Sequence, residues 1–173
     1  NVKVEPPNDN NYYGNAFYYE ATLLETESDG ERDTNSSTSR YWTIESNHKN
    51  NITNLPTGYK LVPATACKPF ANIDTSKQLS RAQFLKNELW ITQYNQEERY
   101  PGGEFPNQLN FEDGLSLWTK QNRSIKNQDI ILWYNFGVTH QPRLEDYPIM
   151  PVEHTGFALK PNNFMNYSCV MDL

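Results

Sequence analysis

The chain has 173 residues, a formal net charge of −6 and a pI near 5.1. An acidic chain of this kind lacks the basic surface that neutralises phosphates, so nucleic acid is excluded as an expected partner. No apolar stretch is long enough to span a bilayer, which excludes a membrane span. Aromatic residues make up 13% and there are 11 prolines, a composition that favours β structure and loops over helices.

In chain order, the predicted elements are short strands separated by long polar loops. Strands are expected over 17–26, 41–44, 59–62, 89–94, 129–138 and 152–159. The segments 27–40 and 46–56 are expected to be polar loops, and 80–86 is the best helical candidate. This array predicts an all-β fold, an antiparallel β-sandwich with long loops and little helix, in a single segment covering 1–173.

The segment from Asp129 to Arg143 carries the most chemical information. A long run of β-branched, aromatic and aliphatic residues follows Asp129 and ends at His140, just before Pro142. Such a run predicts a strand buried on both faces. A histidine at the end of a rigid strand is well placed to bind a metal ion.

The chain has only three histidines, His48, His140 and His154. None belongs to a His-x-His or His-x-x-x-His pair, the spacing that usually presets two metal ligands on one element. His48 is expected to be solvated in a polar loop, and His154 to pack within the last strand. A metal site at His140 therefore requires ligands from outside this chain.

The cysteines and the glycosylation sequons leave the cellular compartment open. Cys67 and Cys169 are the two cysteines, and the sequence does not decide whether they pair. Four N-glycosylation sequons are present, at Asn35, Asn51, Asn122 and Asn166. They favour an extracellular location, but such sequons also arise by chance in a chain rich in asparagine and serine. A peroxisomal or cytoplasmic location stays open.

A set of motifs resembles the catalytic domain of the copper amine oxidases. The motifs are Tyr13-Gly14-Asn15-Ala16-Phe17, Leu89-Trp90-Ile91-Thr92, Glu98-Arg99-Tyr100-Pro101-Gly102-Gly103, Asp129 to Phe157, and Pro161 to Asp172. They occur in the family's order from Tyr13 to the end, so the match is more specific than any single motif. The resemblance implies that residues 1–173 form the C-terminal portion of that domain.

The resemblance also implies metal ligands. His140 aligns with the last of three copper-binding histidines, and a three-imidazole site with open positions suits Cu(II). Asp129 and Ile130 align with ligands of a peripheral calcium site, through a carboxylate and a carbonyl oxygen. The alternative for Asp129 is a solvated acid at the start of a strand. Met150 aligns with a methionine near the copper, although a core methionine is the ordinary interpretation.

A second calcium site, which some family members have, is not implied here. Ala16, Gln121 and Arg123 stand where its carboxylates would be. An arginine at such a position would repel the ion.

The activity that the resemblance implies is that of a primary amine oxidase. Such an enzyme uses copper(II) and topaquinone to convert a primary amine and O₂ into aldehyde, ammonia and hydrogen peroxide. The quinone-forming tyrosine, the base and the His-x-His pair precede this region in the family. We therefore expect no catalytic or quinone-binding residue here, and we expect the isolated chain to be inactive. The implied partners are the rest of the enzyme and a second subunit of a homodimer; the amine is not specified.

The alternative function is a non-enzymatic extracellular β-sandwich that serves as a binding or adhesion module, or a pseudoenzyme. The sequons, the abundant aromatic residues and the incomplete metal site support it. The upstream sequence would discriminate between the two. A His-x-His pair and an Asn-Tyr-Asp/Glu motif would indicate the enzyme.

Overall fold

The computed structural model describes residues 1–65, 67–77, 79–107, 113–168 and 170. It divides into two compact units. Unit 1 comprises Asn1–Thr22, Asn35–Ala64 and Gly156–Leu173, and unit 2 comprises Leu23–Thr34 and Thr65–Thr155. Among the described residues, none of the helices combines the length and apolar character that crossing a membrane requires.

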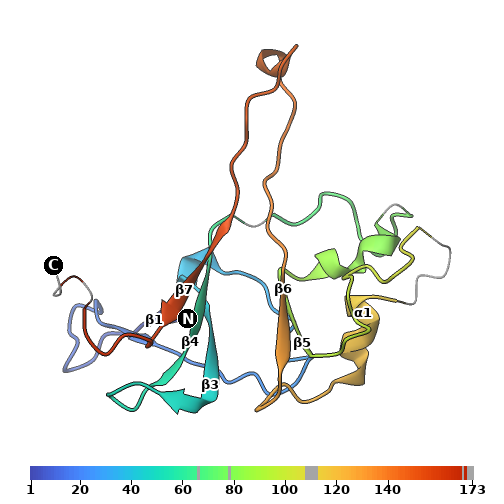
Figure 1. The fold of residues 1–173 in the computed structure, drawn as a ribbon. Coiled ribbons are helices and arrows are strands. Elements are labelled where there is room, and N and C mark those ends of the chain that lie inside the picture. The colour runs from blue at the N-terminus through green and yellow to red at the C-terminus, as the bar shows by residue number, and fades with distance from the viewer. Residues whose placement is uncertain (66, 78, 108–112, 169, 171–173) are drawn as a thin grey trace. The chain divides into compact units, whose positions relative to one another are not determined.

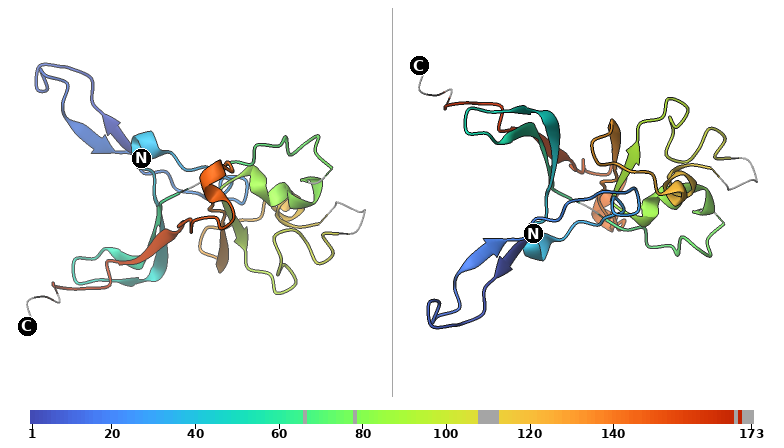
Figure 2. Two further views of the ribbon diagram at one scale, coloured as in Figure 1. Left: turned by 90° about the horizontal axis from the view of Figure 1, so that it is seen from above. Right: turned by 90° about the horizontal axis from the view of Figure 1, so that it is seen from below.

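Unit 1 contains two antiparallel sheets among its described residues (Figure 1). β1 (Val2–Val4) pairs with β2 (Phe17–Tyr19) to form a hairpin ribbon, which is visible in both views of Figure 2. In the other sheet, β4 (Pro56–Pro63) lies between β3 (Trp42–Asn50) and β7 (Phe157–Asn162). Both neighbours run antiparallel to β4, which makes β4 the best protected strand of this unit.

The turn between β3 and β4 is closed by an asparagine side chain. The Oδ1 atom of Asn51 accepts hydrogen bonds from the backbone N–H groups of Thr53, at 3.0 Å, and Leu55, at 2.9 Å. Asn54 adopts a φ of +60°, which asparagine tolerates better than most residues. The expected loop over 46–56 is therefore wrong for its first five residues, because this turn lets β3 continue to Asn50.

Gly58 is required where β4 approaches β3. A Cβ atom at this position would lie 1.9 Å from the carbonyl oxygen of Ile44 and 2.9 Å from the Cα of Glu45, both backbone atoms. We expect Gly58→Ala to lower the free energy of unfolding of unit 1 by about 1–3 kcal/mol, the usual cost of overpacking. Gly137→Ala is the matched control, because a Cβ there has nothing within 4 Å. Equal thermal midpoints for the two variants would contradict this prediction.

In its described residues, unit 2 is built on one antiparallel strand pair and several short helices. β5 (Leu89–Gln93) pairs with β6 (Ile130–Tyr134) through every residue of both strands. The helical elements in the described part of the chain are η1 (Ser36–Thr38) in unit 1 and, in unit 2, η2 (Ser80–Lys86), α1 (Leu115–Trp118), η3 (Thr119–Gln121) and η4 (Leu144–Asp146).

The hydrophobic core of unit 2 is a tryptophan cluster. Trp90 of β5 packs with Leu115 and Trp118 of α1, and Phe84 and Trp133 cover this cluster. The Trp90 Nε1–H donates to the carbonyl oxygens of Phe84, at 2.7 Å, and Asn87, at 3.2 Å. The buried indole therefore contributes apolar area without leaving its N–H unpaired.

The structure confirms the predicted fold class of antiparallel sheets with little helix, but it shifts several boundaries. The helix expected at 80–86 is a 3₁₀ segment kinked at Ala82. The strand expected over 129–138 ends at Tyr134. Its residues are half-buried, whereas we expected burial on both faces. In the described chain it pairs with β5. The last strand begins at Phe157, so His154 is exposed and precedes it, contrary to our expectation.

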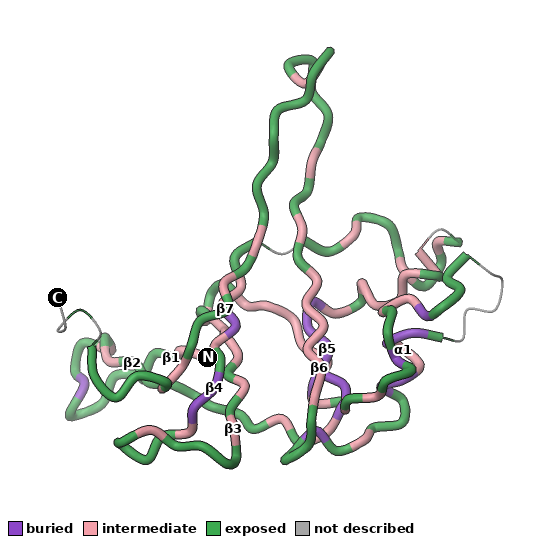
Figure 3. The backbone as a smooth tube through the Cα atoms, in the orientation of Figure 1, coloured by how far each residue is buried: buried purple, intermediate pink, exposed green. Residues whose placement is uncertain are grey.

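Residues 135–155 form a long excursion that we call the arm. It runs outward from β6, turns at η4 and returns, and all of it lies outside any strand (Figure 1). Figure 3 shows that most of the arm is exposed. Large apolar side chains are among the exposed ones, including Leu144, which is 92% exposed, Tyr147, Ile149 and Val152. Contiguous apolar exposure is uncommon in monomeric soluble proteins and marks interaction sites, ligand-binding grooves or aggregation-prone surfaces.

The four sequon asparagines each use their side-chain oxygen to accept a backbone N–H. The acceptors are Asn35, Asn51, Asn122 and Asn166, which bond to Thr38, Leu55, Ser28 and Ile52. These hydrogen bonds give each asparagine a structural role, whether or not it carries a glycan. Cys67 is exposed and forms no disulfide with any described residue, and its pairing with Cys169 stays untested because Cys169 lies outside the described residues.

Candidate metal centre

The base of the arm is fixed to unit 2 by Asn135. Its side-chain amide donates to the carbonyl oxygens of Phe84, at 2.7 Å, and Asn87, at 2.8 Å. Its backbone N–H donates to the carbonyl oxygen of Glu88 at 2.7 Å. The outgoing limb of the arm, which carries His140, therefore starts from a defined position at the end of β6.

The imidazole of His140 lies between two carboxylates that come from later parts of the arm. Its Nε2 atom is 3.2 Å from Asp146 Oδ2, and its Nδ1 atom is 3.4 Å from Glu153 Oε1. Nε2 is buried and forms no hydrogen bond within the described chain, because the contact with Asp146 lacks hydrogen-bond geometry. The side chain as a whole is 22% exposed. The ring therefore bridges the two limbs and the turn of the arm.

Asp146 is held in place by Arg143. Its Oδ2 atom accepts the backbone N–H of Arg143 at 2.8 Å, and its Oδ1 atom is 3.4 Å from the guanidinium. The hydrogen bond from the Arg143 backbone lowers the pKa of Asp146, so the carboxylate stays ionised at neutral pH. Its side chain is only 6% exposed. The η4 turn thus presents a fixed negative group to His140.

The residues around His140 fit one part of a metal site and not a whole one. A half-buried imidazole with an unbonded ring nitrogen suits a transition metal. In the parts of the chain that the structure describes, no three His, Cys, Asp or Glu side chains are grouped to hold an ion. Met150 lies on the returning limb and is half-exposed, so its predicted place near copper stays a prediction. A metal site at His140 would therefore need further ligands from outside the described residues.

Asp129 and Ile130 lie at the start of β6, at the opposite end of that strand from the arm. The carbonyl oxygen of Asp129 accepts the backbone N–H of Tyr94 at 2.7 Å, while the residue itself is exposed. Ile130 pairs with Gln93 and is half-buried. The Asp129 carboxylate therefore faces solvent next to the edge of a paired strand. The calcium site predicted there stays a prediction.

A buried ionic cluster joins three distant parts of unit 2. Arg123 Nη1 and Nη2 donate to the two Glu98 oxygens at 2.9 and 2.8 Å, and its Nε donates to Glu27 Oε1 at 2.8 Å. Glu27 is fully buried, and it also accepts the backbone N–H groups of Arg123 and Gln93. Hydrogen bonding to Glu98 raises the pKa of Arg123, so the guanidinium stays charged. The arginine is thus the cation of a structural cluster.

Sequence reasoning missed the two glutamates of this cluster. Glu27, Glu98 and Arg123 share no local spacing, and only the fold brings them together. Sequence comparison identified Arg123 solely as a residue that argues against a second calcium site. A long polar loop with glutamates at positions 27 and 31 gives no signal that one of the two carboxylates is buried.

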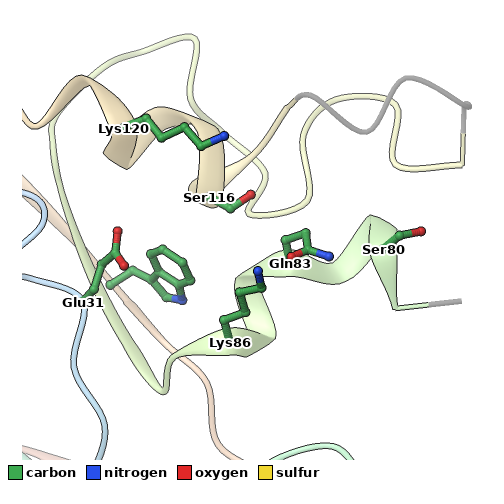
Figure 4. Close-up of a pocket in the computed structure, with 7 residues that line it drawn as sticks. Glu31, Ser80, Gln83, Lys86, Ser116 and Lys120 are labelled. Atoms are coloured by element: carbon green, nitrogen blue, oxygen red, sulfur yellow. The ribbon is translucent and has the colours of Figure 1, made fainter. Parts of the chain in front are cut away.

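A pocket of about 510 Å³ lies on unit 2, away from the predicted ligands (Figure 4). It is lined by Glu31, Ser80, Gln83, Lys86, Trp90, Ser116 and Lys120. Lys86 is paired with Asp74 at 2.7 Å. None of the predicted ligands lines this pocket, so it does not compete with His140 as the candidate site.

Comparison with known proteins shows which family the chain belongs to. The family model described as the copper amine oxidase enzyme domain matches residues 1–173. The chain therefore belongs to the copper amine oxidase family.

Among curated relatives, diamine oxidase [copper-containing] 1, peroxisomal, from Nicotiana tabacum is 50% identical over 174 residues, covering 100% of this chain and 22% of that protein. The primary amine oxidase of Arthrobacter sp. (strain P1) is 40% identical over 173 residues, covering 99% of this chain and 26% of that protein. The chain thus spans about a quarter of the length of these relatives.

Solved structures give the same answer for the fold. The copper-containing benzylamine oxidase of Hansenula polymorpha matches with a TM-score of 0.86 and 31% identity, over 99% of this chain and 27% of that one. The amine oxidase of Aspergillus nidulans, at 17% identity, shares the fold with a TM-score of 0.82. These matches confirm the predicted β-sandwich of the copper amine oxidases.

Proposed function

We propose that this chain is part of a copper- and topaquinone-dependent primary amine oxidase, whose C-terminal catalytic portion it forms. The observation that carries the proposal is the family match over all 173 residues. When bound, the copper and quinone supply the electron-transfer chemistry with O₂ that side chains lack. The chain's own contribution is the His140 imidazole, which the arm presents with one ring nitrogen unbonded.

The remaining ligands come from the rest of the same enzyme. The accessible surface of the chain is 12954 Å². Even two separate compact bodies of half this mass would together expose only about 10,500 Å² by the usual size scaling. The excess surface includes the apolar residues of the arm, which supports packing against further polypeptide. A homodimer is the proposed assembly of the whole enzyme.

The activity is tested on the intact protein that contains this chain. We expect redox-cycling quinone staining of the denatured band and hydrogen peroxide production from a primary amine. The relatives suggest the panel, since their names include diamine, methylamine, histamine and benzylamine oxidases. A copper-loaded protein with neither staining nor peroxide on any of these amines would favour the non-enzymatic β-sandwich.

The proposed calcium site has its own test. In the intact protein, we expect EGTA to lower the melting temperature, and Asp129→Asn to abolish this effect of the chelator. An ion at 100 times its dissociation constant contributes about 2.7 kcal/mol to stability, which is a measurable shift. Asp9→Asn is the control, since Asp9 is likewise exposed. If wild type and Asp129→Asn respond equally to EGTA, these residues do not bind the ion.

A further inference from the structure

The pocket on unit 2 gathers positive charge in an otherwise acidic chain. Its lining contains two lysines and one acid, Lys86, Lys120 and Glu31, whereas the whole chain carries a net charge of −6. A concave site with an excess of one sign of charge attracts ligands of the opposite sign. Its volume of about 510 Å³ lies in the range of pockets that bind small organic molecules. The lining therefore favours an organic anion.

The two ammonium groups reach the pocket from different elements. Lys86 is the last residue of η2. Ser116 of α1 and Lys120 of η3 lie across the pocket from η2 (Figure 4). A pocket of this volume with cations on two facing walls suits a ligand with two anionic ends better than one compact ion.

The donors on both walls are available to a ligand. Among the described residues, neither the Lys120 ammonium nor the Ser116 hydroxyl has a hydrogen-bond or ion-pair partner. Lys86 is paired with Asp74 at 2.7 Å, but the Asp74 side chain is 72% exposed. Exposed ion pairs of this kind are weak, so the carboxylate of a ligand can take the place of Asp74.

The other lining groups leave an apolar surface between these donors. Glu31 Oε2 accepts the side-chain amide of Asn87 at 3.3 Å, so this carboxylate already has a donor. The side chains of Ser80 and Gln83 both donate to backbone carbonyl oxygens. Trp90 donates its N–H to two further backbone carbonyls, which leaves its ring surface for the ligand. An indole surface suits a hydrocarbon chain.

We propose that this pocket binds a small organic dianion of the dicarboxylate class. One carboxylate accepts hydrogen bonds from Lys120 and Ser116. The other pairs with Lys86 in place of Asp74, and the carbon chain lies against Trp90. This site goes beyond amine oxidation, because the two lysines repel the ammonium group of a primary amine.

Calorimetric titration of the intact protein with straight-chain dicarboxylates, from succinate to adipate, tests the proposal. We expect a one-to-one complex, and weaker binding of acetate and inorganic phosphate, because neither reaches both walls. Lys86→Gln and Lys120→Gln should each weaken binding by about tenfold or more, since each removes a charge-assisted hydrogen bond. Asp74→Asn should strengthen binding by up to about fivefold, because it releases Lys86 from its ion pair.

Lys126→Gln is the matched control. It removes the same charge from a lysine outside the pocket, which pairs with Glu25 at the surface, and it should bind dicarboxylates as the wild type does. Equal losses of affinity in Lys126→Gln and Lys120→Gln would overturn the site, because the dianion would then respond only to overall charge. The proposal also fails if millimolar dicarboxylates give neither binding heat nor a shift in melting temperature, or if phosphate binds as tightly as any of them.

Discussion

Replacing Arg123 with alanine is expected to lower the free energy of unfolding by about 3–5 kcal/mol, because it leaves buried carboxylates without a counter-ion. The effect is largest at Glu27, because its side chain is fully buried and water cannot compensate its charge. The Arg123 side chain itself is only 18% exposed, so water cannot replace it without local opening. Chemical denaturation of the intact protein, followed by tryptophan fluorescence, measures the effect.

Hydrogen exchange locates the damage. The backbone N–H of Gln93 donates to Glu27, so its protection should fall in the Arg123→Ala variant. Lys126→Ala is the matched control, because Lys126 pairs with Glu25 at the surface, where both side chains are 50% exposed. Surface pairs contribute about 0–1 kcal/mol. Similar denaturation midpoints for the two variants would show that the buried cluster is not a major source of stability.

Replacing His140 with alanine is expected to remove copper from the intact protein, with an affinity loss of more than about 100-fold. The loss should exceed that of an outer partner, because a coordinating imidazole is removed. Metal content after dialysis measures the loss of copper. Because copper is also expected to be needed for activity, quinone staining and hydrogen peroxide production are followed in the same samples.

The other two histidines provide the controls for this experiment. His154 is exposed on the returning limb of the same arm, and His48 is exposed on β3. His154→Ala and His48→Ala should both retain wild-type copper content. Stoichiometric copper in His140→Ala, or its loss in His154→Ala, would contradict the assignment of the ligand.

Hydrophobic patterns in the sequence predicted where strands of the fold lie, but not how far each strand extends. The apolar, β-branched run from Leu89 predicts β5, and the structure places it there. The strand at 129–138 was drawn too long, because apolar composition does not reveal where strand pairing ends. The extension of β3 to Asn50 depends on hydrogen bonds that the side-chain oxygen of a turn asparagine accepts, which hydrophobic patterns do not detect.

The candidate site was predictable only in part, for a similar reason. The position of His140 after an apolar run and the family motifs predict that it is a ligand, and this stays a prediction. The carboxylates of Asp146 and Glu153 approach its ring because the arm folds back on itself, and no spacing in the sequence indicates this. The partners of Arg123 likewise come from segments 25 and 96 positions away.

The carbonyl oxygens of Phe84 and Asn87 each accept from two donors, the Trp90 indole and the Asn135 amide. The packed interior of unit 2 and the root of the arm consequently share one pair of acceptors. A substitution that shifts Trp90 would displace both oxygens and, through Asn135, misalign the limb that bears the imidazole. Defects in metal loading can thus originate in tryptophan packing, at residues that never contact an ion.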